Sequence, residues 1–135
     1  MITASRPLPR SRLDADDHHI AERFRALEEP RRRRLACALV REALAELTVT
    51  LPPAILGLLG TAGIATPAQL GELDRLAAST GGPPVEDDFR RARIVAVARY
   101  ALSPQPRAAE EAVHEALHAR EFFELALDVL RHRLD

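Results

Sequence analysis

The chain has no lysine, no tryptophan and only one cysteine among its 135 residues. A single cysteine, Cys37, excludes an intramolecular disulfide framework and is typical of proteins in a reducing cytosol. The N-terminal residues hold no apolar run of the kind that a secretory signal carries, so we expect a cytoplasmic protein. Because all nineteen basic residues are arginine, the composition indicates first a bacterial genome of high GC content, and second a selection for guanidinium chemistry.

Aromatic residues are also scarce, since four phenylalanines and one tyrosine stand against twenty leucines and twenty-four alanines. Alanine and leucine favour helices, and 135 residues are enough to enclose one core. We therefore predict an all-α fold, a single domain with orthogonal or bundle-like packing of five to six helices. Residues 1–13, with three arginines and two prolines, are predicted to form a flexible basic tail, and residues 14–135 the helical domain.

Proline, glycine and capping residues divide the predicted domain into helices. Pro30 is expected to end a first helix and to begin a second, because a proline is tolerated in the first turn. Thr66 and Gln69 have the spacing of a capping box, and residues 81–84 form the clearest break before a fifth helix. The last helix is predicted to run without interruption over about residues 107–133.

Residues 47–71 contain no charged side chain, although 29% of the whole chain is charged. Prolines, glycines and four threonines dilute the hydrophobicity of this stretch, so we predict no membrane span. We expect a short helix after Pro53 that is buried at the centre of the bundle. An exposed position would instead indicate contact with a partner or a membrane.

The predicted last helix carries two apolar stripes, of which one is enough for a place against the core. The second stripe consists of His114, His118, Phe122, Leu125 and Val129. A helix with two such stripes lies at the centre of a bundle or offers one face to a partner. Phe122, Leu125 and Val129 are therefore candidate partner-binding residues.

Residues 114–118 have the sequence HEALH, which matches the motif H-E-x-x-H. In this motif two imidazoles one turn apart bind zinc, and the glutamate is the general base. The motif resembles that of zincin metalloproteases, which implies a peptidase centred on His114, Glu115 and His118. The rest of the chain has no strand pattern to align a peptide and no separate third ligand, so we favour a chain without enzymatic activity.

The same segment contains two E-x-x-H pairs, Glu111 with His114 and Glu115 with His118. This spacing is similar to that of ferritin-like and hemerythrin-like bundles, in which carboxylates and imidazoles project inward from facing helices. The resemblance implies a divalent metal held by His114, His118, Glu115 and Glu111, with further ligands from residues 18–22. The alternative is that these histidines lie at the surface or at the edge of the core.

The only basic run of the chain consists of Arg31, Arg32, Arg33 and Arg34. The stretch that contains it, FRALEEPRRRRLACALV, resembles the opening helix of winged-helix regulators of the ArsR type. That resemblance implies a transcriptional regulator whose arginines contact DNA. The alternative from the residues alone is a solvated arginine face whose long side chains cover apolar surface.

The formal net charge of −1 argues against a dedicated nucleic-acid-binding protein, but the charges are segregated along the chain. Residues 14–30 hold six acidic residues and two arginines, residues 31–46 five arginines and two glutamates, and residues 108–135 seven acidic residues and three arginines. Such segregation would steer a charged partner.

We therefore predict a non-enzymatic helical protein-interaction module: an adaptor, an inhibitor, an immunity-type protein or a small regulatory subunit. Its expected partner is another protein, and a homodimer is compatible with the sequence. A DNA-binding regulator and a metal-binding helical bundle are the two alternatives.

Overall fold

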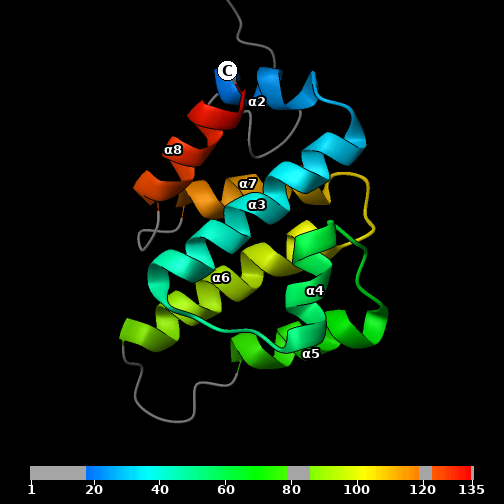
Figure 1. Cartoon of the computed structure of the whole chain (residues 1–135), viewed down its shortest axis with the longest axis vertical. Coiled ribbons are helices and arrows are strands. Elements are labelled where there is room, and N and C mark those ends of the chain that lie inside the picture. Colours follow the sequence, from blue (N-terminus) through cyan, green and yellow to red (C-terminus); the bar gives the residue numbers. More distant parts are fainter. Residues whose placement is uncertain (1–17, 79–85, 119–122, 135) are drawn as a thin grey trace, which may run out of the picture.

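The structure, a computed structural model, describes residues 18–78, 86–118 and 123–134, and these residues form seven helices and no strand (Figure 1). The helices are α2 (His18–Arg25), α3 (Glu29–Leu47), α4 (Pro53–Thr61), α5 (Pro67–Ala78), α6 (Glu86–Leu102), α7 (Ala108–His118) and α8 (Phe123–Leu134). The predicted all-α class is confirmed, although the described residues form seven helices where five to six are predicted, because the segment predicted as one last helix forms two. The predicted tail at residues 1–13 and the break at residues 81–84 lie outside the described residues.

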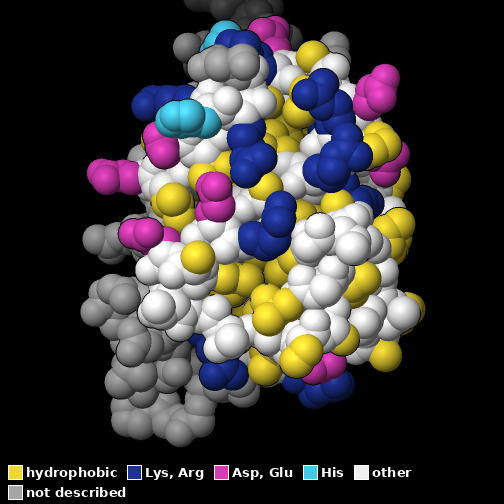
Figure 2. All heavy atoms as spheres, viewed as in Figure 1, with side chains coloured by type: hydrophobic (Ala, Val, Ile, Leu, Met, Phe, Trp, Pro, Cys, Tyr) yellow, Lys and Arg dark blue, Asp and Glu magenta, His cyan; other side chains and the backbone are white. Residues whose placement is uncertain are grey.

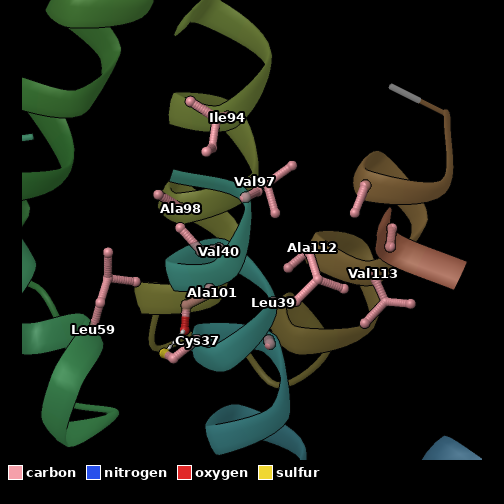
Figure 3. Packing of buried hydrophobic residues seen from close by; sticks show 14 of the residues in the cluster. Cys37, Leu39, Val40, Leu59, Ile94, Val97, Ala98, Ala101, Ala112 and Val113 are labelled. Atoms are coloured by element: carbon pink, nitrogen blue, oxygen red, sulfur yellow. Dashed lines mark hydrogen bonds between the residues drawn. The ribbon is translucent and has the colours of Figure 1, made fainter. Parts of the chain in front are cut away.

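Helix α6 lies at the centre of the fold and packs against α3, α5 and α7. Its second half is buried on almost every side, with Ile94, Val95, Val97, Ala98, Ala101 and Leu102 all in the core. Figure 3 shows side chains of α3, α6 and α7 meeting in this region, among them Val40, Val97 and Ala112. A helix that is buried on several sides has no single apolar stripe, so the sequence of α6 does not indicate its central position.

Helix α3 is the longest described helix and connects the core with the surface. Pro30 lies in its first turn, as predicted, and Thr48 ends it in the left-handed conformation with a φ of 51°. The helical spacing of the sequence predicts one apolar face, formed by Leu35, Leu39, Ala43, Leu44 and Leu47. This face is confirmed, because the first four are buried and Leu47 is half-buried against the core. The opposite face carries exposed arginines.

The prediction of one uninterrupted last helix is wrong, because the structure contains two helices, α7 and α8, that run in different directions (Figure 1). Helix α7 buries Ala112, Val113 and Ala116, whereas α8 buries Ala126, Val129 and Leu130 against other parts of the core. Neither proline nor glycine separates the two helices. The division therefore follows from tertiary packing, which a helical period in the sequence does not report.

The uncharged stretch is not buried at the centre, so this prediction is also wrong. Helix α4 buries only Ile55 and Leu59, while Leu56 and Ile64 are 37% and 55% exposed. Gly57 and Gly60 face open space, since a Cβ atom built on either would meet nothing within 4 Å. Ala62 ends the helix in the left-handed conformation, with a φ of 52°. The central position belongs to α6, and α4 lies at the periphery against α3 and α6.

The predicted capping box is confirmed at the start of α5. The Thr66 backbone N–H donates to Gln69 Oε1 at 2.9 Å, and the Gln69 N–H donates to Thr66 Oγ1 at 3.2 Å. Leu73 is the fully buried residue of this helix, which packs on α6. None of the described helices has the length and the hydrophobicity that crossing a bilayer requires.

Candidate binding groove

The four consecutive arginines point in different directions, because successive residues of a helix are rotated by about 100°. Arg33 is 9% exposed, and its Nη1 donates to the carbonyl oxygens of Ala101 at 3.2 Å and Ser103 at 2.9 Å. These carbonyls lie at the C-terminus of α6, where backbone acceptors have no partner within the helix. Arg33 is therefore a structural cap that joins α3 to α6.

Arg32 faces a second interior site between α3 and α7. Its Nε atom and Oε2 of the buried Glu110 have no hydrogen-bond partner among the described residues, and both residues line a cavity of about 10 Å³. The other carboxylate oxygen of Glu110 accepts from Arg25 Nε at 3.2 Å. Half of the predicted basic run thus serves the interior of the fold.

Arg31 and Arg34 remain exposed and line a groove formed by α3, α4 and α8. The groove has a volume of about 320 Å³, and its further arginines are Arg41 and Arg133. Its apolar lining consists of Leu27, Leu35, Ala38, Leu59 and Ala62. Figure 2 shows basic side chains gathered over the upper half of this face, with hydrophobic surface exposed between them.

The arginines of the groove differ in how their charge is compensated. Arg133 Nη2 lies 3.6 Å from Glu42 Oε1. Within the described part of the chain, no hydrogen bond or ion pair engages Arg31, Arg34 or Arg41. Three guanidinium groups are thus available to an anionic ligand, in the planar geometry that matches carboxylates.

Cys37 is buried between α3 and α6, with its Sγ 4.0 Å from the Ala101 carbonyl oxygen (Figure 3). Burial raises the pKa of this thiol to about 11, and the nearby Arg33 and Arg41 offset only part of the effect. A protonated, buried thiol is a poor nucleophile at neutral pH. Cys37 therefore contributes to packing rather than to chemistry.

The predicted metal ligands lie on α7. His114 is buried and His118 exposed, and their rings are tilted at a centroid distance of 4.4 Å. Glu111 and Glu115 are half-buried on the same helix. Among the residues that the structure describes, no group of three or more histidine, cysteine, aspartate and glutamate side chains is placed to hold an ion. Metal binding by this segment stays a prediction.

The predicted partner-binding stripe is not one exposed face. Val129 is 5% exposed and belongs to the core, and Leu125 is half-buried against it, because α8 packs on α2, α3 and α7. Phe122 lies outside the described residues. The sequence interpretation missed Arg41 and Arg133. Arg41 shares a helical face with Arg34, seven positions earlier, whereas Arg133 reaches the groove only through the tertiary fold.

Comparisons with known proteins add no assignment, since no family model, curated protein or solved structure matches the chain.

Proposed function

We propose that this chain is a non-enzymatic helical protein-interaction module, acting as an adaptor, an inhibitor, an immunity-type protein or a small regulatory subunit. The observation that supports this proposal is the groove of α3, α4 and α8, where three arginines without an ion-pair partner among the described residues lie beside apolar side chains. Arginine is enriched at protein interfaces and among the residues that dominate their binding energy.

The position of α4 supports the same proposal. This helix carries no charge, exposes Leu56, and is followed by the exposed Ile64. Its residues Gly60 and Thr61 line the groove, so an uncharged wall faces the arginines of α3. Apolar residues bordered by polar ones are typical of a protein-binding site.

Affinity purification from the native host tests this function, with the intact chain as bait and chemical crosslinking before lysis. We expect one dominant protein with the wild type and with Arg75→Glu, a control at an exposed arginine of α5 outside the groove lining. The variant Arg31→Glu/Arg34→Glu/Arg41→Glu should lose that protein. Recovery of no protein above background with any of the three baits would contradict the proposal.

The predicted alternative of a winged-helix DNA-binding regulator has less support. The described residues contain no strand for a wing, and two of the four consecutive arginines face the interior. For a metal-binding bundle, the described residues bring together the rings of His114 and His118 but contain no group of three or more ligand side chains. Both alternatives therefore rank below protein binding.

A further inference from the structure

The exposed arginines of α3 form a regular row. Arg31, Arg34 and Arg41 are separated by three and seven residues, so they lie on one face of the helix, with Ala38 between them. At 1.5 Å per residue the row extends about 15 Å along the helix axis. Carboxylates at the same spacing on a second helix would meet these guanidinium groups one for one.

The opposite wall of the groove allows a close approach of a helix backbone. Gly60 lines the groove, and Gly57 lies one turn earlier on the same side of α4. Among the described residues, a Cβ atom built on either glycine would meet nothing within 4 Å, and neither glycine has a positive φ that would require it. Glycine inside a helix is unfavourable by about 0.5–1 kcal/mol relative to alanine, so the fold itself has no use for these two residues.

The floor of the groove defines the remaining chemistry of the ligand. Leu27 and Ala62 are half-buried and still meet solvent, whereas Leu35, Ala38 and Leu59 are buried. A ligand with only charged groups would therefore leave the apolar surface of Leu27 and Ala62 in water. The volume of about 320 Å³ accommodates a large aliphatic side chain. A matching ligand therefore combines a row of carboxylates with a neighbouring row of aliphatic residues.

Nucleic acid fits these observations less well. The chain has a net charge of −1, and Glu42 lies beside the groove in its ion pair with Arg133. Phosphate backbones bind to strongly basic surfaces and make little use of an apolar floor. An acidic protein segment uses both parts of the groove.

We propose that the groove binds an acidic amphipathic helix of the partner protein. Its carboxylates pair with Arg31, Arg34 and Arg41, and its aliphatic side chains enter the floor beside the open glycine face of α4. This assignment rests on the proposed function and names the class of partner segment.

The test uses the intact chain and a fluorescent helical peptide of about fifteen residues, with a row of glutamates beside a row of leucines. Two matched peptides replace the glutamates by glutamine or the leucines by serine. We expect fluorescence anisotropy to show the acidic amphipathic peptide binding roughly tenfold more tightly than either matched peptide, and less tightly as salt increases. Equal binding of the glutamate and glutamine peptides would overturn the proposal.

Two sets of variants locate the site. Arg31→Gln/Arg34→Gln/Arg41→Gln should weaken peptide binding by roughly tenfold, whereas Arg75→Gln should not. Gly60→Leu should block the approach of the helix and weaken binding, although it leaves the thermal midpoint of the free chain equal or higher. Gly71→Ala on α5 is the control for a change of helix propensity alone. If the arginine variant and the Gly60 variant both bound the peptide as tightly as the wild type, the peptide would bind elsewhere and the assignment would be contradicted.

The remaining outcomes identify a different occupant. Tighter binding of a DNA duplex than of the peptide, lost in the arginine variant, would assign the groove to nucleic acid. Self-association that sedimentation detects in the wild type and not in the arginine variant would assign it to a second copy of the chain. If the arginine variants captured the same host protein as the wild type, protein interaction would remain supported, but the assignment of the groove as its site would be contradicted. Peptide binding without any captured host protein would support the groove as a binding site and contradict the proposed function as a protein-interaction module.

Discussion

The positions of α6 and α4 are the opposite of those that their charge content would predict. Helix α6 carries seven charged residues and lies at the centre of the fold, whereas α4 carries none and lies at the periphery. The charges of α6 fall mainly in its first half, so its second half is free to be buried on several sides. An uncharged sequence thus does not define a core, because burial depends on how many neighbours a helix has.

The largest contrast should come from removing the same side chain in the two regions. Ile94→Ala on α6 empties a fully buried position and should lower the free energy of unfolding by about 3 kcal/mol. Ile64→Ala, just beyond α4, should change it by less than about 0.5 kcal/mol because the side chain is exposed. Urea denaturation measures both values. Similar losses for the two variants would show that residues 47–71 are covered in solution.

The end of α6 offers the next test, through its contact with Arg33. Arg33→Met removes two hydrogen bonds to buried carbonyl oxygens and should cost about 2–3 kcal/mol of stability. Arg34→Met, one residue later and exposed, should be neutral within about 0.5 kcal/mol. The measurement is again the urea midpoint at constant slope. If the two substitutions were equally tolerated, Arg33 would not be the cap of α6.

The pH dependence of stability tests whether Cys37 is buried in the contact between α3 and α6. Because the folded pKa of about 11 lies above the ordinary value of 9.0, the thiol contributes stability that is complete below pH 9 and is lost as pH rises towards 11. The loss should reach about 2–3 kcal/mol. Stability of the wild type and of Cys37→Ala, measured from pH 8 to about pH 11, isolates this effect from other titrating groups. Parallel curves for the two proteins would contradict a buried thiol.

The smallest expected effect is a gain. Gly57→Ala on α4 should stabilise the chain by about 0.5–1 kcal/mol, because the added methyl group meets open space and alanine favours the helix. The reverse substitution in the centre, Ala98→Gly on α6, should destabilise by about 1 kcal/mol or more, since it also removes a buried methyl group. Calorimetry of both variants provides the comparison. A loss of stability in Gly57→Ala would mean that another group lies against this face.

Local signals predicted those features that depend on neighbouring residues. The capping box of Thr66 and Gln69, the first turn at Pro30 and the apolar face of α3 all depend on spacings of a few residues, and all three are confirmed. The division of α7 from α8 and the peripheral place of α4 depend on packing between distant segments. Sequence periodicity carries no information on such packing.

The candidate site was predicted only in part, for the same reason. The arginine run correctly predicts which turn of α3 contributes to the site. Because of the rotation of the helix, however, Arg33 faces the interior, whereas Arg31 and Arg34 line the groove. Helical spacing alone would have added Arg41. Arg133 and the α4 wall approach the groove through tertiary contacts, which the order of residues does not reveal.

The shallow burial of α4 has a consequence for local opening. With two buried side chains, two interior glycines and a left-handed alanine at its end, this helix has few interactions to break before its amides meet water. Its amide hydrogens should therefore exchange with solvent well before those of α6, in an opening that leaves the rest of the fold intact. A helix bound in the groove would slow that exchange, so protection of α4 would report occupancy of the site directly.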